Sequence, residues 1–214
     1  VENRLSELME NAQNPTVAPY AKEGEVMLRV TARADTTEQA RALTEPMVAK
    51  ICGELGEVVY GIDVGSLEQC VSDLLRRSGK TLAAAESCTG GLLASRMTAL
   101  PGASAVFAGG VVAYTPEVKQ TLLGIPRSML ETHGAVSEPV ARAMAESIRR
   151  SAGADIGIGI TGLAGPDGDG SSTPVGTVYI AIASGSDCKA ERYSLGAGRN
   201  RIRISAANRA LDMV

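Results

Sequence analysis

The sequence predicts a wound three-layer α/β/α domain with a mixed sheet, preceded by a small α+β domain. From residue 67 onward, short apolar strands alternate with helical segments and glycine-rich turns, which is typical of a wound α/β domain. Before that point, helical and strand periodicities follow one another in a different style of sequence. With 214 residues, 44% of them apolar, the chain can bury a sizeable core. We therefore expect two domains, 1–66 and 67–214.

The first domain is expected to contain helix, strand, helix and strand, in that order. Its opening helix has an apolar face and ends at the turn signal of Asn14 and Pro15. Residues 25–33 alternate apolar and polar side chains like a half-buried strand, and residues 36–55 have helical spacing. Residues 58–62 are apolar enough to predict a second short strand.

The second domain is expected to alternate strands with helices. Its predicted strands are 81–85, 106–114, 156–161, 175–183 and 190–195, and its predicted helices are 67–78, 91–100, 138–151 and 199–214. The turn at residues 185–187 indicates that the last two strands form an antiparallel pair.

Composition narrows the classes of function. A net charge of -3 argues against a general affinity for nucleic acid or for an anionic membrane, because both need a basic surface. No long apolar run or cleavable leader is visible, so we expect a cytoplasmic protein. Four scattered cysteines and a single histidine, His133, predict reduced thiols and no metal site.

Ser87 is the first candidate for chemistry. It lies in AESCTGG between a predicted strand and a predicted helix, where free N–H groups near Thr89 and Gly90 could hold an oxyanion. On local sequence alone the stronger interpretation is that residues 86–89 cap the helix. Cys88 is a rival nucleophile, although no base lies near it in the sequence.

Lys119 is the candidate base for Ser87. A serine hydroxyl needs a base, and a lysine kept neutral by burial can serve where histidine is scarce. Lys119 stands in AYTPEVKQ, where Pro116 starts a short helix after a predicted strand. The alternative for Lys119 is an exposed helix lysine, and the alternative for nearby Tyr114 is a core aromatic residue.

The segment GIGITGLAGPDGDGSSTPVGTVYIA is the richest glycine loop of the chain. Such a loop can direct N–H groups at an anion beside the end of a parallel strand, which suits a phosphate. A surface loop without function is the equal alternative. Arg199, Arg201 and Arg203 begin the last predicted helix, and any one of them could pair with phosphate through two N–H groups.

Four segments together resemble the C-terminal domain of the competence/damage-inducible CinA family: AAAESCTGGLLASRMTALPGAS, FAGGVVAYTPEVKQTLLGI, HGAVSEPVARAMAESIR and GITGLAGPDGDGSSTPVGTVYIA. The resemblance covers residues 67–214 and implies a nicotinamide mononucleotide deamidase that works with a Ser-Lys pair assisted by tyrosine, without cofactor. The pattern falls on Ser87, Lys119 and Tyr114. It also implies that Arg199 binds the substrate.

The resemblance further places Thr161, Gly162 and Gly165 near a small-molecule nucleotide substrate. Two positions depart from the family pattern: Thr173 replaces a frequent lysine, and the alanine of GAGRNRIR replaces an acidic or polar residue.

Residues 1–66, especially NPTVAPYAKEGEV, resemble the family's KH-like module, which suggests a homodimer or higher homo-oligomer more than nucleic-acid binding. The alternative function is a catalytically silent nucleotide-binding or assembly module of a larger CinA-type protein.

Overall fold

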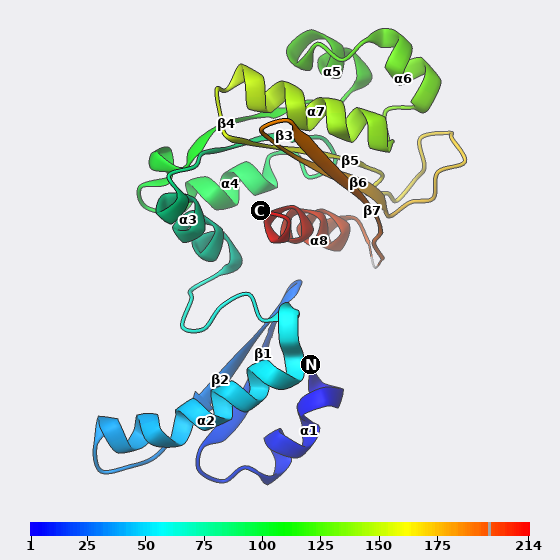
Figure 1. Cartoon of the computed structure of the whole chain (residues 1–214). Coiled ribbons are helices and arrows are strands. Elements are labelled where there is room, and N and C mark those ends of the chain that lie inside the picture. Colours follow the sequence, from blue (N-terminus) through cyan, green and yellow to red (C-terminus); the bar gives the residue numbers. More distant parts are fainter. Residues whose placement is uncertain (197) are drawn as a thin grey trace. The chain divides into compact units, whose positions relative to one another are not determined.

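The computed structural model describes residues 1–196 and 198–214. The chain forms two compact units, Val1–Asp63 and Val64–Val214 (Figure 1). In the part of the chain that is described, no helix is both long and apolar enough to cross a membrane.

The first unit contains two helices and one antiparallel strand pair. Its elements are α1 (Glu2–Asn11), β1 (Thr16–Lys22), β2 (Glu25–Thr31), α2 (Thr37–Leu55) and a 3-10 turn (Gly56–Val58). The first helix, the second strand and the second helix confirm the prediction. Its order is nevertheless helix, strand, strand, helix, so the predicted strand at residues 58–62 is wrong and β1 was missed.

Both differences arise from strand pairing, which the spacing of apolar residues along the sequence does not reveal. Pro19 interrupts the apolar pattern of β1, but β2 supplies a partner for the whole strand, with Val17 opposite Val30. The apolar residues after α2 have no paired strand among the described residues. Val58 is 68% exposed and Ile62 is 57% exposed, so this segment contributes little to a core. An isolated apolar run without a paired neighbour does not form a strand.

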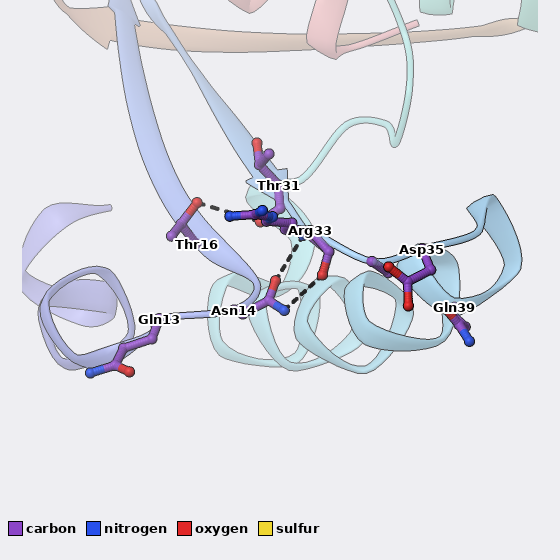
Figure 2. A pocket seen from close by; sticks show the side chains of 9 residues that line it. Gln13, Asn14, Thr16, Thr31, Arg33, Asp35 and Gln39 are labelled. Carbon is purple, nitrogen blue, oxygen red and sulfur yellow. Dashed lines mark hydrogen bonds between the residues drawn. The ribbon is translucent and has the colours of Figure 1, made fainter.

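The core of the first unit lies between the helices and one face of the strand pair. Its buried members are Leu5, Val17, Ile51 and Leu55. Asn14 fixes the end of the pair, because its amide accepts from the Arg33 N–H and donates to the Arg33 carbonyl, both at 2.9 Å (Figure 2). The described residues that line the hollow around Asn14 include no paired nucleophile and base.

The second unit is a five-stranded mixed sheet in the order β4-β3-β5-β6-β7. The strands are β3 (Leu82–Glu86), β4 (Phe107–Val112), β5 (Ile156–Gly162), β6 (Thr177–Ser184) and β7 (Asp187–Ser194). β3 runs parallel to both β4 and β5, whereas β6 is antiparallel to β5 and to β7. This confirms the predicted mixed sheet.

Helices cover both faces of the sheet, as Figure 1 shows. On one face lie α3 (Leu67–Ser78), α4 (Leu92–Thr98) and α8 (Arg199–Asp212). On the other face lie α5 (Pro116–Leu123), α6 (Arg127–His133) and α7 (Glu138–Ser151). α6 was not predicted from the sequence. β3 is buried on both sides, which explains its continuous apolar run.

Two glycines of β5 let α7 lie directly against the sheet. A Cβ added at Gly157 would lie 2.1 Å from the Ala145 carbonyl oxygen, and one at Gly159 would lie 2.3 Å from that of Ala141. Both distances are far below van der Waals contact. The helix backbone therefore occupies the space that side chains on these two positions would need.

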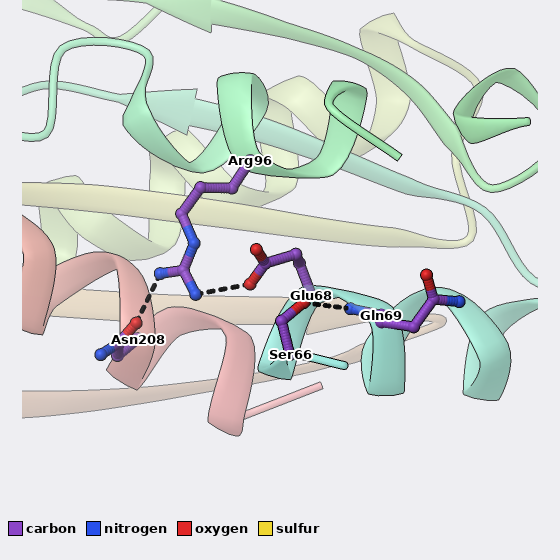
Figure 3. A network of polar contacts seen from close by, with 5 residues as sticks. All are labelled: Ser66, Glu68, Gln69, Arg96 and Asn208. Atoms are coloured by element: carbon purple, nitrogen blue, oxygen red, sulfur yellow. Dashed lines mark hydrogen bonds and ion pairs between the residues drawn. The ribbon is translucent and has the colours of Figure 1, made fainter. Parts of the chain in front are cut away.

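A polar network joins the three helices of the opposite face. Arg96 of α4 donates to Glu68 of α3 at 2.7 Å and also to Asn208 of α8 (Figure 3). The side chains of Arg96 and Glu68 are only 16% and 19% exposed. The network therefore links α3, α4 and α8 through side chains that are largely shielded from solvent.

Candidate active site

Three parallel strands end at one edge of the sheet. The Ser87 N–H donates to Ile160 of β5 at 2.9 Å, and the Ala113 N–H, just after β4, donates to Glu86 of β3 at 2.8 Å. The residues that follow β3 and β4 therefore stand side by side next to the end of β5. Ligands of open α/β sheets bind at such carboxyl ends, where the strand order changes direction.

Ser87 opens a tight turn between β3 and α4. The Gly90 N–H closes this turn on the Ser87 carbonyl at 3.0 Å, with Gly90 and Gly91 at φ of +63° and +88°. The start of α4 is capped by Glu86, whose buried carboxylate accepts from the N–H groups of Leu93 (3.1 Å) and Ala94 (2.8 Å). The capping role thus belongs to Glu86, and the Ser87 hydroxyl is left for other partners.

The Ser87 hydroxyl is paired with Lys119. The Lys119 Nζ lies 2.9 Å from the Ser87 Oγ and 2.7 Å from the Ala113 carbonyl oxygen. Lys119 is 1% exposed, which excludes the alternative of a solvated helix lysine. No carboxylate pairs with it among the residues that the structure describes. Burial lowers the pKa of Lys119 from 10.5 to about 8, because the ammonium form loses its hydration.

Local signals place Lys119 one turn into α5. The Thr115 side chain accepts from the Val118 N–H at 3.4 Å, Pro116 occupies the first turn, and Gly124 ends the helix in a left-handed conformation. The Lys119 side chain is thereby directed inward, toward the end of β3.

Cys88 follows Ser87 in the sequence, but its side chain lies in the apolar core. It is 5% exposed and belongs to the apolar cluster under α4 and α8. Burial raises the pKa of the Cys88 thiol to about 11. Because the thiolate is the reactive form, Cys88 is a poor nucleophile in this setting.

The turn also determines which N–H groups remain for an oxyanion. The Gly90 N–H, a predicted donor to the oxyanion, already donates to the Ser87 carbonyl oxygen. The N–H groups of Cys88 and Thr89 make no hydrogen bond to a described backbone oxygen. The Thr89 Oγ1 is buried and also has no hydrogen-bond partner among the described residues.

Tyr114 and Arg199 form a second polar contact at this edge. Arg199 donates to the Tyr114 hydroxyl at 2.8 Å and to the Gly165 carbonyl at 2.6 Å. Tyr114 is 53% exposed, so it is not a core aromatic residue. Its backbone carbonyl oxygen lies 3.5 Å from the Ser87 Oγ, whereas its hydroxyl makes no hydrogen bond to Ser87 or Lys119 among the described residues.

The glycine-loop candidates have mainly structural contacts. Thr161 is fully buried and donates to the Ala135 carbonyl at 2.7 Å. A Cβ at Gly162 would lie 2.8 Å from the Thr177 carbonyl oxygen, and one at Gly165 would lie 2.6 Å from the Val175 Cγ1. These residues shape the loop beside Arg199, and only Gly165 contacts it directly.

Of the other two arginines, Arg203 reaches the nucleophile turn. Its Nη2 and Nε lie 2.9 and 3.3 Å from the Thr89 carbonyl oxygen, while Arg201 is exposed. Neither Arg199 nor Arg203 pairs with a carboxylate within the described ranges. Their spacing of four residues on α8 was a signal that both could share one face.

The two departures from the family pattern lie in the glycine loop and just before α8. Thr173 is half-buried in the loop, and its N–H donates to the Ser171 Oγ at 3.1 Å. Ala197 lies outside the described residues. Within the described ranges, no group of three or more potential ligands is placed to hold a metal ion.

Comparison with known families decides the identity of both units. The model of the CinA C-terminal domain matches residues 64–214, and that of the damage-inducible protein CinA KH domain matches residues 1–61. The chain belongs to the CinA family. The first match includes the whole edge described above, with Ser87, Lys119 and Arg199.

Relatives extend the CinA assignment over the whole chain. A CinA-like protein of Kosmotoga olearia is 48% identical over 214 residues, and one of Dictyoglomus thermophilum is 44% identical over the same length. Each match covers 100% of this chain and 52% of the relative. The chain thus spans about half the length of the curated relatives it matches.

Solved CinA structures resemble the chain as well. The competence damage-inducible protein A from Klebsiella pneumoniae subsp. pneumoniae has a TM-score of 0.67 and 35% identity, covering 69% of this chain and 91% of that chain. A CinA superfamily protein from Escherichia coli has a TM-score of 0.66 and 30% identity, covering 75% and 98%.

Proposed function

We propose that the second unit hydrolyses the carboxamide of nicotinamide mononucleotide to nicotinate mononucleotide and ammonia. Neutral Lys119 takes the hydroxyl proton of Ser87 as the Oγ bonds to the carboxamide carbon. The C–N bond then breaks, and the Lys119 ammonium gives its proton to the leaving nitrogen, which departs as ammonia. Water attacks the resulting acyl ester, loses a proton to Lys119, and releases the acid while the Ser87 Oγ regains its hydrogen.

The observation that carries this proposal is the buried Lys119 Nζ at 2.9 Å from the Ser87 Oγ. A pKa of about 8 leaves about a tenth of this lysine neutral at pH 7, roughly 300 times more than an ordinary lysine pKa would. The N–H groups of Cys88 and Thr89, which make no hydrogen bond to a described backbone oxygen, are the candidates for the oxyanion. Burial therefore makes Lys119 available as a base in a chain with a single histidine.

The arginines at the same edge favour a phosphorylated substrate. Arg199 and Arg203 have only neutral described partners, namely the Gly165 and Thr89 carbonyls and the Tyr114 hydroxyl. An uncompensated guanidinium beside a reactive serine attracts an anion. We assign the phosphate to Arg199, since it donates to Gly165 of the glycine loop, and we assign Tyr114 to the substrate side of the site.

The test is ammonia release by the purified chain, measured in the presence of a chelator. Nicotinamide mononucleotide, its riboside and free nicotinamide serve as substrates, and the mononucleotide is expected to react best at low concentration. Ser87→Ala is expected to abolish release while retaining substrate binding. A Ser87→Ala variant with full activity, or a strict requirement for added metal, would refute the Ser-Lys reaction.

A further inference from the structure

The turn that carries Ser87 is fastened by an arginine that the proposed reaction does not use. Arg203 of α8 directs two donors, Nη2 at 2.9 Å and Nε at 3.3 Å, at the single carbonyl of Thr89. α8 and α4 are in contact, and α4 begins directly after the turn. Two donors from one planar group restrain the carbonyl more narrowly than a single donor does.

This turn needs such a restraint because of its glycines. Gly90 and Gly91 both have positive φ, and glycine leaves the backbone free to adopt other conformations. A Cβ at Gly90 would lie 3.6 Å from the Arg203 Nη2, so the guanidinium packs against the glycine itself. Arg203 thereby limits the freedom that the two glycines introduce.

The peptide that Arg203 contacts is linked to the nucleophile residue. The Thr89 carbonyl and the Gly90 N–H belong to one peptide group, and that N–H donates to the Ser87 carbonyl at 3.0 Å. A guanidinium on the carbonyl polarises this peptide and strengthens the hydrogen bond at its other end. The buried Thr89 hydroxyl has no described partner, so its side chain adds no second anchor by hydrogen bonding.

The helix that carries Arg203 is itself held in place. Asn208, further along α8, receives a hydrogen bond from Arg96 of α4, and Arg96 also pairs with Glu68 of α3 (Figure 3). α8 is therefore joined to α4 and its preceding turn by side chains at two positions along its length, Arg203 and Asn208. It forms a fixed support for the turn that precedes α4.

We propose that Arg203 is a positioning residue that holds Ser87 in its attacking orientation by fastening the Thr89 carbonyl. This inference rests on the proposed function, because it takes Ser87 as the nucleophile. It differs from a role as phosphate ligand. A phosphate ligand affects only phosphorylated substrates, whereas a positioning residue affects every reaction of Ser87.

The experiment uses a fluorophosphonate probe, which carries no nucleotide. The Ser87 Oγ bonds to phosphorus, fluoride leaves, and the hydroxyl proton passes to Lys119. Intact-mass measurement follows the labelling rate, with Ser87→Ala as the blank. Arg203→Met is expected to slow labelling about 10- to 100-fold, since a small misplacement of a reactive group has effects of this size. The midpoint of the pH profile is expected to stay near that of the wild type.

Two further variants separate positioning from folding. Arg203→Lys keeps the charge and one donor, so it is expected to recover part of the labelling rate with a wild-type melting temperature. Arg209→Met removes an exposed arginine of the same helix, which contacts Tyr193 and Asp212, and is expected to label at the wild-type rate. If Arg203→Met folds and labels as fast as the wild type, the inference is wrong.

Amide hydrogen exchange of Gly90 tests the restraint without any reaction, because its N–H donates to the Ser87 carbonyl. Arg203→Met, or Arg203→Lys if the methionine variant does not fold, is expected to speed exchange of this amide about tenfold, because local opening becomes easier. Unchanged exchange would overturn the inference. If the Arg203 variant exchanges faster but the wild type neither labels nor releases ammonia, the restraint by Arg203 stands and the proposed function is wrong.

Discussion

Replacing Lys119 by methionine should abolish ammonia release and change how stability depends on pH. In the wild type the pKa of Lys119 is lowered from 10.5 to about 8 by burial, so the unfolded chain binds this proton more tightly than the folded chain does. The lowered pKa therefore destabilises the fold below pH 8, and the loss is relieved as the pH rises from 8 to 10.5. At pH 7 it corresponds to about 3 kcal/mol, and at pH 10 to about 1 kcal/mol.

Methionine has a similar length and no charge, so it does not undergo this titration. It leaves the Ala113 carbonyl without the Lys119 donor, which costs about 1 to 3 kcal/mol at every pH. The free energy of unfolding of Lys119→Met, minus that of the wild type, is therefore expected to fall by about 2 kcal/mol between pH 7 and pH 10. Titrations shared by both proteins cancel in this difference.

The assay is urea unfolding of both proteins at several pH values. Lys80→Met serves as the matched control, because Lys80 is an exposed lysine of the same unit, and its difference from the wild type is expected to change little with pH. A Lys119→Met difference that is also independent of pH would show that Lys119 stays charged in the fold. Lys119 could then not be the base of the proposed reaction.

Three further predictions follow from the site and the core. The kcat/KM of the wild type should rise with pH to a plateau with a midpoint near pH 8, since Lys119 acts after losing its proton, and a flat profile from pH 6 to 9 would contradict this role. Cys88→Ala should keep most of the ammonia release, because the buried thiol has a raised pKa; loss of activity would restore the cysteine as nucleophile. Gly159→Ala should lower the free energy of unfolding by several kcal/mol in urea titrations, because its Cβ would lie 2.3 Å from the Ala141 carbonyl oxygen. The control Gly153→Ala is strained only by its φ of +62° and should lower the free energy of unfolding by about 1 kcal/mol. Equal losses at both positions would argue against the close contact of α7 with β5.

Helices were the elements that could be predicted most closely. The predicted helices 67–78 and 138–151 coincide with α3 and α7, because their start signals are local: Ser66 accepts from the Gln69 N–H, and Pro139 follows Ser137 in the first turn. Strands were harder. Residues 58–62 have a strand-like composition but no paired strand in the described part of the chain, whereas β1 has a poor pattern but is paired along its whole length.

For the site, the residues were available from the sequence, but their relations were not. Ser87 and Lys119 are 32 positions apart and touch only because β4 pairs beside β3, which places the start of α5 next to the end of β3. The same holds for Arg203, which lies 114 positions from Thr89. Local sequence patterns do not reveal contacts between residues that lie so far apart in the chain.

The chemistry of Lys119 was decided by tertiary structure alone. Local sequence determined that a lysine would lie one turn inside a short helix begun by Thr115 and Pro116, a setting in which most lysines are solvated. Packing of α5 against the sheet removed this lysine from water and placed its Nζ between Ser87 and the Ala113 carbonyl. A pKa depends on the solvent and charges around a group, so the same residue is an ordinary cation in the unfolded chain and a candidate base in the folded one.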